Sequence, residues 1–290
     1  MVSSNRFLVI VRAGDRSLHP EWLRGTEAMQ WDLVVSYFGD DPNRFRTESE
    51  TRIDDKGTKW QGLHALLTRT DFWRRYDYIW LPDDDLSTDK QAINRFFTEI
   101  AELRLSLAQP ALSWRSHFSH PVTIRHPSFR ARWTNFVEIM APCFERSFLE
   151  ACLPTFSETL SGWGLDWLWP HRLGPETRRS AVIDAVEVTH TRAVGSGPSY
   201  ARLAESGITA REEGKALLLK HDFKLAGPPK VVASIDDRGN VLDASAPDDA
   251  AALHALLARD WTAFIAQRQQ LSTPQVVWQT QVKRYGETKT

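Results

Sequence analysis

Three consecutive carboxylates, Asp83, Asp84 and Asp85, lie just beyond the apolar run at 76–81. Adjacent carboxylates repel one another, and a hard cation with oxygen ligands relieves that repulsion. Asp83 and Asp85 are two positions apart and can converge on one ion while Asp84 turns away from it. A solvated acidic turn is the alternative interpretation. The place directly after a buried strand favours a metal site, because ligands of open α/β sheets bind outside the carboxyl ends of the strands.

A further carboxylate, Asp166, stands in the aromatic segment SGWGLDWLWP at 161–170. Gly162 and Gly164 permit a sharp entry into a helix, which would place Asp166 at or near the helix N-terminus between bulky aromatic side chains. A carboxylate walled in this way can serve as a general base. The alternative is an N-cap aspartate in an aromatic core.

His190 ends the apolar run at 181–189, and Arg192 follows two residues later. A single histidine after a strand usually has a structural role, but a neutral imidazole is also a common metal ligand. We expect His190 to complete a metal site that Asp83 and Asp85 begin. We expect Arg192 to pair with a phosphate.

Apolar patterning predicts the elements that position these residues. Continuous apolar runs are typical of strands buried on both faces, and a 3.6-residue spacing of apolar side chains indicates helices. We expect strands at 7–11, 32–38, 76–81, 107–113, 136–140 and 181–189, and helices at 21–24, 60–69, 89–105 and 147–153. Strands that alternate with helices favour an α/β layered domain with a largely parallel sheet.

The pattern changes near residue 225, where Gly227-Pro228-Pro229 interrupts the chain. The stretch 231–241 is typical of a small hairpin, because turn residues lie at its centre. The stretch 248–267 predicts a helix. We therefore predict a main domain over 1–225 and a C-terminal hairpin and helix appendage over 226–290.

Composition excludes several classes of function. The chain has 290 residues and a formal charge of −1, so no basic field points to nucleic acid or to an anionic membrane. Cys143 and Cys152 lie in apolar surroundings typical of small buried hydrophobes. The apolar run near the N-terminus is too short to span a membrane and lacks a cleavage site, so we expect a cytoplasmic protein without a transmembrane segment. P-loop, HExxH and GxSxG motifs are absent from the sequence.

The set as a whole resembles GT-A fold glycosyltransferases. In that family a DxD pair after a Rossmann-like strand binds a metal and a diphosphate, a later acidic residue in a glycine-rich motif faces the acceptor, and a late histidine adds a metal ligand. Asp83 and Asp85 match the pair, Asp166 matches the acidic residue and His190 matches the histidine, in the same order along the chain.

The motifs YDYIWLPDDDL, SGWGLDWLWP and VTHTR are also similar to those of a largely uncharacterised domain-of-unknown-function family that is grouped with such transferases. The resemblance covers roughly Arg6 to Gly195. One departure concerns the base, because this chain has a single carboxylate at Leu165-Asp166 where many relatives carry two.

The resemblance implies a Rossmann-like GT-A three-layer domain with a mostly parallel mixed sheet, and a metal-dependent glycosyltransferase activity. Mn²⁺ or Mg²⁺ would hold a nucleotide-diphosphate sugar, and the acceptor would be a carbohydrate or another hydroxyl compound. Asp166 would take the proton of the acceptor hydroxyl, and the configuration would invert. The residues expected to contact the sugar donor are Arg12, Ala13, Gly14, Lys59, Asp84 and Arg192.

Two alternatives stay open at this point. A metal-dependent phosphohydrolase also places an acidic cluster after a strand, but it uses an aspartate nucleophile on the first strand. Here the first strand ends in Arg12-Ala13-Gly14-Asp15, and Asp15 keeps that alternative open. The second alternative is a non-catalytic module that binds a nucleotide or a sugar.

Overall fold

One mixed sheet runs through the whole of the computed structural model, which describes residues 5–46, 51–174, 177–193, 205, 207–225 and 227–270. Gly195, where the resemblance ends, and 271–290 of the expected appendage lie outside the described residues. In spatial order the strands are β3 (Thr51–Asp54), β2 (Trp31–Tyr37), β1 (Phe7–Ala13), β4 (Tyr78–Trp80), β8 (Cys143–Glu145), β6 (Leu107–Leu112), β9 (Ser180–His190), β7 (Ala131–Thr134), β10 (Val231–Ile235) and β11 (Val241–Asp243). A two-residue strand, β5 (Leu86–Ser87), pairs with β9 outside this order.

Strand direction confirms the predicted mostly parallel mixed sheet. β3, β2, β1 and β4 are mutually parallel neighbours. β8 is antiparallel to both β4 and β6, so β6 runs in the direction of β4, and β9 is parallel to β6. β7 and β11 run the other way, and β10 between them returns to the main direction. With β8, β7 and β11 reversed, the other seven of these ten strands share one direction.

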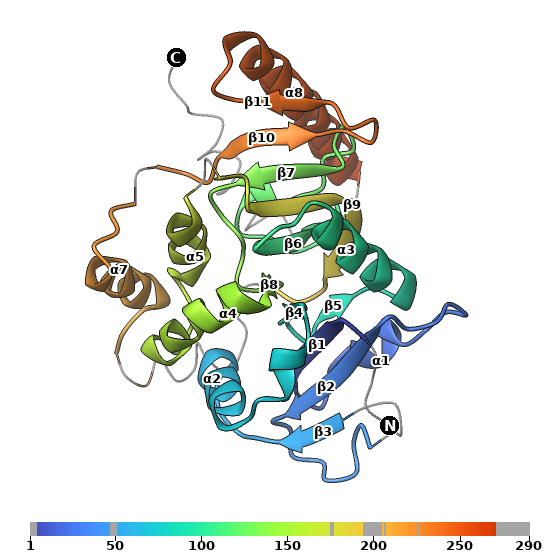
Figure 1. Ribbon diagram of the computed structural model, residues 1–290, viewed down its shortest axis with the longest axis vertical. Coiled ribbons are helices and arrows are strands. Elements are labelled where there is room, and N and C mark those ends of the chain that lie inside the picture. Colours follow the sequence, from blue (N-terminus) through green and yellow to red (C-terminus); the bar gives the residue numbers. More distant parts are fainter. Residues whose placement is uncertain are drawn as a thin grey trace.

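Alternation along β1 shows why the domain has three layers. Val9, Val11 and Ala13 face one core, whereas Leu8 and Ile10 face the other. Helix α3 (Lys90–Glu102) covers the first face with Ile93, Phe96, Phe97 and Ile100. The opposite face is covered by α2 (Lys59–Arg69), α4 (Arg146–Cys152) and α5 (Leu165–Leu173), and Figure 1 shows these helices on the side away from α3. The predicted α/β layered architecture is therefore confirmed.

The remaining helical elements are short or lie at the periphery. They are α1 (His19–Trp22), α7 (Ala210–Lys220), α8 (Pro247–Gln270) and three 3₁₀ helices, η1 (Phe72–Arg75), η2 (Pro121–Thr123) and η3 (Leu153–Glu158). Within the described ranges, no helix combines the length and apolarity that a membrane crossing requires. Cys143 and Cys152 are both buried and free, as predicted.

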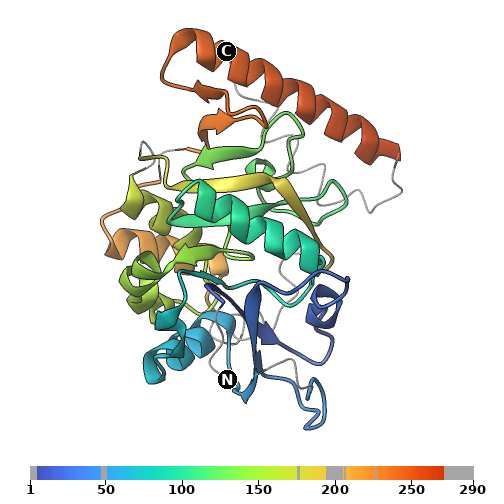
Figure 2. The same cartoon turned by 45° about the vertical axis from the view of Figure 1, so that its right-hand side comes forward.

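The C-terminal hairpin and helix are confirmed as elements. β10 and β11 are antiparallel partners, and β10 pairs with β7, so the hairpin extends the main sheet. Helix α8 lies along this end of the molecule, as Figure 2 shows, and its Phe264 belongs to the core of the α3 face. The domain boundary at 225/226 stays a prediction.

The strand predicted at 136–140 is wrong. This stretch is an irregular, largely buried connection between β7 and β8. Its backbone groups bond to groups outside any strand ladder, since Val137 N–H donates to the Asp166 carbonyl and the Met140 carbonyl accepts from Asp83 N–H. Buried backbone needs such partners wherever it leaves regular structure. The stretch Phe136–Ala141 is called the 136–141 segment below.

Candidate active site at the carboxyl edge of the sheet

Asp85 and His190 meet because β5 pairs with the last residues of β9, with Leu86 opposite His190. His190 Nε2 lies 3.3 Å from Asp85 Oδ2, and both side chains are buried. His190 Nδ1 donates to the His117 carbonyl at 2.8 Å. Burial lowers the His190 pKa, but the hydrogen bond and the charge of Asp85 outweigh it and raise that pKa to about 9.

One oxygen of Asp85 is left over from this contact. Asp85 Oδ1 is buried and has no hydrogen-bond partner among the described residues. A buried carboxylate oxygen without a partner loses about 1–3 kcal/mol of solvation, so such atoms are rare in folded proteins. The oxygen is therefore available to a ligand.

Asp83 forms an ion pair with a lysine of helix α2. Lys59, the first residue of α2, places its Nζ 2.6 Å from Asp83 Oδ1. The same Nζ donates to the carbonyls of Ile139 and Met140 at 2.7 and 3.3 Å. Burial raises the Asp83 pKa against the attraction of Lys59, and burial lowers the Lys59 pKa against the attraction of Asp83. The side chain of Asp83 is 38% exposed, so a ligand can reach it.

Asp84 bonds to other groups than the Asp85–His190 contact. Its Oδ2 accepts from the Gly14 N–H at 2.8 Å, and its Oδ1 accepts from Arg192 Nη1 at 2.8 Å. Asp84 therefore joins the end of β1 to the stretch that follows β9. Arg192 is one-third exposed and also donates to the Arg16 carbonyl.

The Arg12 side chain is directed into the protein. Its guanidinium is buried and donates to Ser36 Oγ, to the Asp55 carbonyl and to the Gly57 carbonyl at 2.8–2.9 Å. These bonds hold the loop between β3 and α2 against β2. Ala13 and Gly14 follow at the strand end, and a Cβ on Gly14 would lie 3.0 Å from the Phe38 ring. The expected place of Arg12, Ala13 and Gly14 in a nucleotide pocket stays a prediction.

Asp166 lies in the first turn of α5, where the glycines put it. The N-cap of α5 is Gly164 at φ +94°, so the alternative of an N-cap aspartate is wrong. Gly162, at φ +86°, has no room for a side chain, because a Cβ there would lie 2.1 Å from Trp60 Nε1. Asp166 Oδ1 accepts from Trp167 N–H at 3.0 Å. Burial raises the Asp166 pKa to about 7, against the lowering effect of backbone N–H groups.

The 136–141 segment joins the two ends of the site. It accepts from Asp83 N–H and from Lys59 at its C-terminal half, and it donates to Asp166 O at its start. Glu138, in the middle of the segment, is 6% exposed. Burial raises its pKa to about 8, with a lowering effect from His190 and raising effects from Asp166 and Asp83. The backbone next to Glu138 reaches both ends of the site, since Val137 N–H donates to Asp166 O and the Ile139 carbonyl accepts from Lys59 Nζ.

Glu138 is the site residue that the sequence prediction missed. The sequence offered one indication, a carboxylate inside the apolar run FVEIMA. A strand with one face exposed to solvent would explain that carboxylate equally well. No group of three His, Cys, Asp or Glu side chains within the described ranges is arranged as a preformed metal cage. The structure brings together two of the predicted metal ligands, Asp85 and His190, and holds Asp83 on Lys59.

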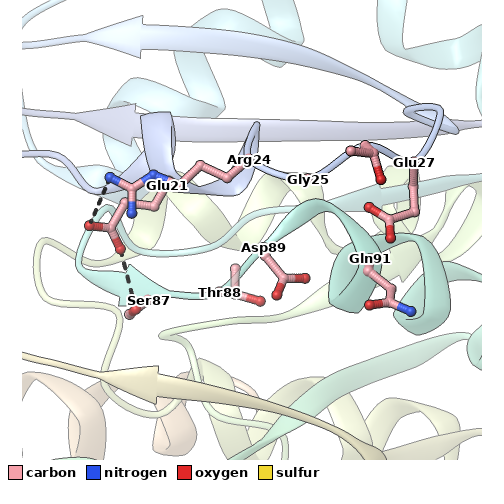
Figure 3. A pocket seen from close by; sticks show the side chains of 9 residues that line it. Glu21, Arg24, Gly25, Glu27, Ser87, Thr88, Asp89 and Gln91 are labelled. Carbon is pink, nitrogen blue, oxygen red and sulfur yellow. Dashed lines mark hydrogen bonds and ion pairs between the residues drawn. The ribbon is translucent and has the colours of Figure 1, made fainter.

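A surface pocket of about 560 Å³ lies next to this region, between α1, β5 and the start of α3 (Figure 3). Glu21 accepts from Ser87 Oγ at 3.3 Å and lies 3.8 Å from Arg24. None of the predicted site residues lines this pocket, which is formed by Glu21, Arg24, Gly25, Thr26, Glu27, Ser87, Thr88, Asp89 and Gln91.

No protein-family model matches the chain, so the resemblance to a family of unknown function stays a prediction. No curated protein sequence matches it either. Among solved structures, S. aureus TarS in complex with UDP-GlcNAc aligns with a TM-score of 0.48 at 12% identity, over 68% of this chain and 60% of that one. The alignment with another TarS structure covers only 37% of the length of that TarS chain.

Two further structures have comparable scores. Glucosyl-3-phosphoglycerate synthase from Mycobacterium tuberculosis, in complex with Mn²⁺, UDP-Glc and phosphoglyceric acid, has a TM-score of 0.45 at 13% identity, over 77% of this chain and 82% of that one. A putative nucleotide-diphospho-sugar transferase from Desulfovibrio desulfuricans has a TM-score of 0.39 at 11% identity, over 75% and 98%. The chemistry of this chain therefore rests on the geometry of its own site.

Proposed function

We propose that the chain is a metal-dependent glycosyltransferase of the GT-A type, which moves a sugar from a nucleotide-diphosphate donor to a hydroxyl acceptor with inversion at the anomeric carbon. One observation carries the proposal. Asp83, two residues before the Asp85 that contacts His190, and a separate acidic residue, Asp166, are hydrogen-bonded through their backbones to opposite ends of the 136–141 segment. Sugar transfer needs these two functions side by side, one for the leaving diphosphate and one for the acceptor hydroxyl.

The chemistry of the acidic end suits a divalent cation, Mn²⁺ or Mg²⁺. Asp85 Oδ1 is buried without a partner among the described residues. His190 donates its Nδ1–H to a carbonyl, so Nε2 could bind a metal once the metal displaced the Nε2 proton that faces Asp85. Asp83 would be the third protein ligand after leaving Lys59. The cation would neutralise the charge that develops on the diphosphate.

Asp166 supplies the base. A carboxylate with a pKa near 7 is half ionised at neutral pH and is basic enough to take the proton of an attacking hydroxyl. The next residue, Trp167, is buried and packs against Phe136 and His120. Attack from the Asp166 side, opposite the diphosphate, inverts the anomeric configuration.

Further residues would hold the diphosphate and the nucleotide. Arg192 has a partly exposed guanidinium beside Asp84 and would bind a phosphate group of the donor. Lys59, once released from Asp83, is the second cation within reach of the same charge. Backbone at Ala13 and Gly14 would line the nucleotide pocket, with Arg12 and Asp84 supporting it through their hydrogen bonds.

The phosphohydrolase alternative requires Asp15 as a nucleophile. Asp15 instead accepts from the Tyr37 hydroxyl and from backbone N–H groups of Asp40 and Asp41 at the end of β2. These bonds lower the Asp15 pKa, with the Tyr37 hydrogen bond as the largest cause. A carboxylate stabilised in this way is a poor nucleophile.

A melting-temperature screen tests the proposal. Nucleotide diphosphates and nucleotide sugars are each added with Mn²⁺, with Mg²⁺ or with a chelator, to the wild type and to Asp83→Ala. We expect a metal-dependent rise for one nucleotide, absent in the variant, followed by sugar transfer to a hydroxyl acceptor panel. A rise with metal alone, together with phosphate release from simple esters, would establish the phosphohydrolase instead. Tight nucleotide-sugar binding without turnover would establish the binding module.

A further inference from the structure

Glu138 is a buried acid that the proposed reaction does not yet use. Glu138 is only 6% exposed, and its Oε2 has no hydrogen-bond partner among the described residues. The Glu138 backbone N–H donates to Gln109 Oε1 at 2.6 Å. The backbone is thus held firmly while one side-chain oxygen is left unsatisfied.

The backbone on either side of Glu138 places it between the two ends of the site. Val137 N–H donates to the Asp166 carbonyl at the acceptor end, and the carbonyls of Ile139 and Met140 accept from Lys59 Nζ and from Asp83 N–H at the diphosphate end. The charges of His190, Asp83 and Asp166 also act on the Glu138 carboxyl. Lys59 does not neutralise it, because the three acceptors of that ammonium are Asp83, Ile139 O and Met140 O. Glu138 is therefore flanked by both ends of the reaction and paired with neither.

We propose that Glu138 binds a hydroxyl group of the transferred sugar through its free oxygen. This inference rests on the proposed function. In a sugar transfer the anomeric carbon lies between the leaving diphosphate and the acceptor oxygen, so a group with both ends as neighbours lies alongside the sugar ring. A sugar hydroxyl can donate a hydrogen bond to the free oxygen of Glu138, which would satisfy the buried carboxyl.

The burial of Glu138 also determines the form in which it binds. Burial disfavours the charged form of a carboxyl, so it raises the Glu138 pKa and favours the neutral form. A neutral carboxyl both donates and accepts a hydrogen bond, as a carboxamide does. Glutamine is therefore the matched replacement, whereas methionine keeps the length of the side chain and removes the hydrogen bonds.

Titration calorimetry on the full chain with Mn²⁺ tests the inference. The probes are UDP with UDP-glucose and UDP-N-acetylglucosamine, and GDP with GDP-mannose. For a pair that binds, we expect Glu138→Met to raise the Kd of the nucleotide sugar about tenfold and to leave the Kd of the nucleotide diphosphate within twofold. Glu138→Gln is expected to keep both values within about threefold of the wild type. Melting curves of both variants verify the fold.

Each other outcome overturns the inference. Equal effects of Glu138→Met on both ligands of a pair, or no effect on either, would assign Glu138 a structural role while the proposed function stands. Normal binding by Glu138→Gln with turnover as low as that of Asp166→Asn would make Glu138 the base. A wild type that binds no nucleotide would overturn the proposed function, and this inference with it.

Discussion

Asp85 Oδ2 lies 3.3 Å from His190 Nε2 although 105 residues separate the two along the chain. The contact is produced by β5, which turns the chain after the acidic triplet back against the end of β9. Thr191 reinforces it, since its N–H and its hydroxyl both donate to the Asp85 carbonyl. The side-chain contact and the two bonds from Thr191 thus hold Asp85 and His190 together at the edge of the sheet.

We predict that His190→Ala and Asp85→Asn lose the stabilisation that Mn²⁺ confers. A ligand at 100 times its Kd stabilises the folded state by about 2.7 kcal/mol, and each variant removes one ligand of the proposed site. The melting temperature with and without Mn²⁺ measures the effect. Asp248→Asn, an exposed carboxylate of α8, is the control and should keep the full Mn²⁺ effect. Unchanged Mn²⁺ stabilisation in both variants would place the metal elsewhere.

We predict that Asp166→Asn lowers kcat by about 10²–10⁴-fold, because general bases contribute that much to proton transfer. The wild type should gain activity as the pH rises through about 7, where Asp166 loses its proton. The variant should lack this acid limb while it binds the nucleotide diphosphate normally. A wild-type kcat that stays flat between pH 5.5 and pH 8 would contradict the assignment.

We predict that Glu138→Gln makes the protein more resistant to unfolding, and increasingly so as the pH rises from about 5 to about 8. The folded-state pKa of Glu138, about 8, lies above its ordinary value of 4.5. The unfolded chain therefore releases the proton first, and the wild type loses stability over this range, by about 3–5 kcal/mol in total. Glutamine has no proton to hold and avoids that loss.

Urea unfolding of the wild type and Glu138→Gln at several pH values measures this difference. Glu27→Gln, at an exposed position, is the control and should follow the wild type at every pH. A constant difference between Glu138→Gln and the wild type from pH 5 to pH 8 would mean that Glu138 titrates normally.

We predict that Gly162→Ala destabilises the protein more than Gly239→Ala does. Both glycines have a similar positive φ, +86° and +83°, which costs an alanine about 1–2 kcal/mol. Only Gly162 also faces a close neighbour, Trp60 Nε1 at 2.1 Å from the added Cβ, whereas nothing lies within 4 Å of a Cβ on Gly239. Overpacking of this kind adds about 1–3 kcal/mol.

The free energies of unfolding of the two glycine variants provide the measurement. Because Gly162 sets the entry into α5, its variant should also lose activity through a displaced Asp166. Equal losses of stability in the two variants would show that Trp60 moves aside without cost.

The sequence by itself determined the layered architecture and the strand ends where the site lies. β1, β2, β4 and β9 are rich in buried apolar residues, which is typical of strands covered on both faces. Because parallel strands end at the same edge, the sequence predicts that Asp83–Asp85 and His190 share that edge. Gly162 and Gly164 likewise predicted a sharp helix entry at Asp166, and α5 begins there.

Only the tertiary structure decided which of these residues touch. β5 has two residues, too few for a periodic pattern, yet it brings Asp85 to His190. The apolar run at 136–140 has the composition of a strand, but its backbone bonds instead to the backbones of Asp166 and Asp83. The sequence therefore provided no reason to expect Glu138 near the candidate site. Local patterns report whether a side chain is buried, whereas the partner of a buried polar group is set by segments far apart in the chain. For that reason the sequence could identify Asp83, Asp85, Asp166 and His190 as candidates, but it could not reveal Lys59 on Asp83 or the free oxygen of Glu138.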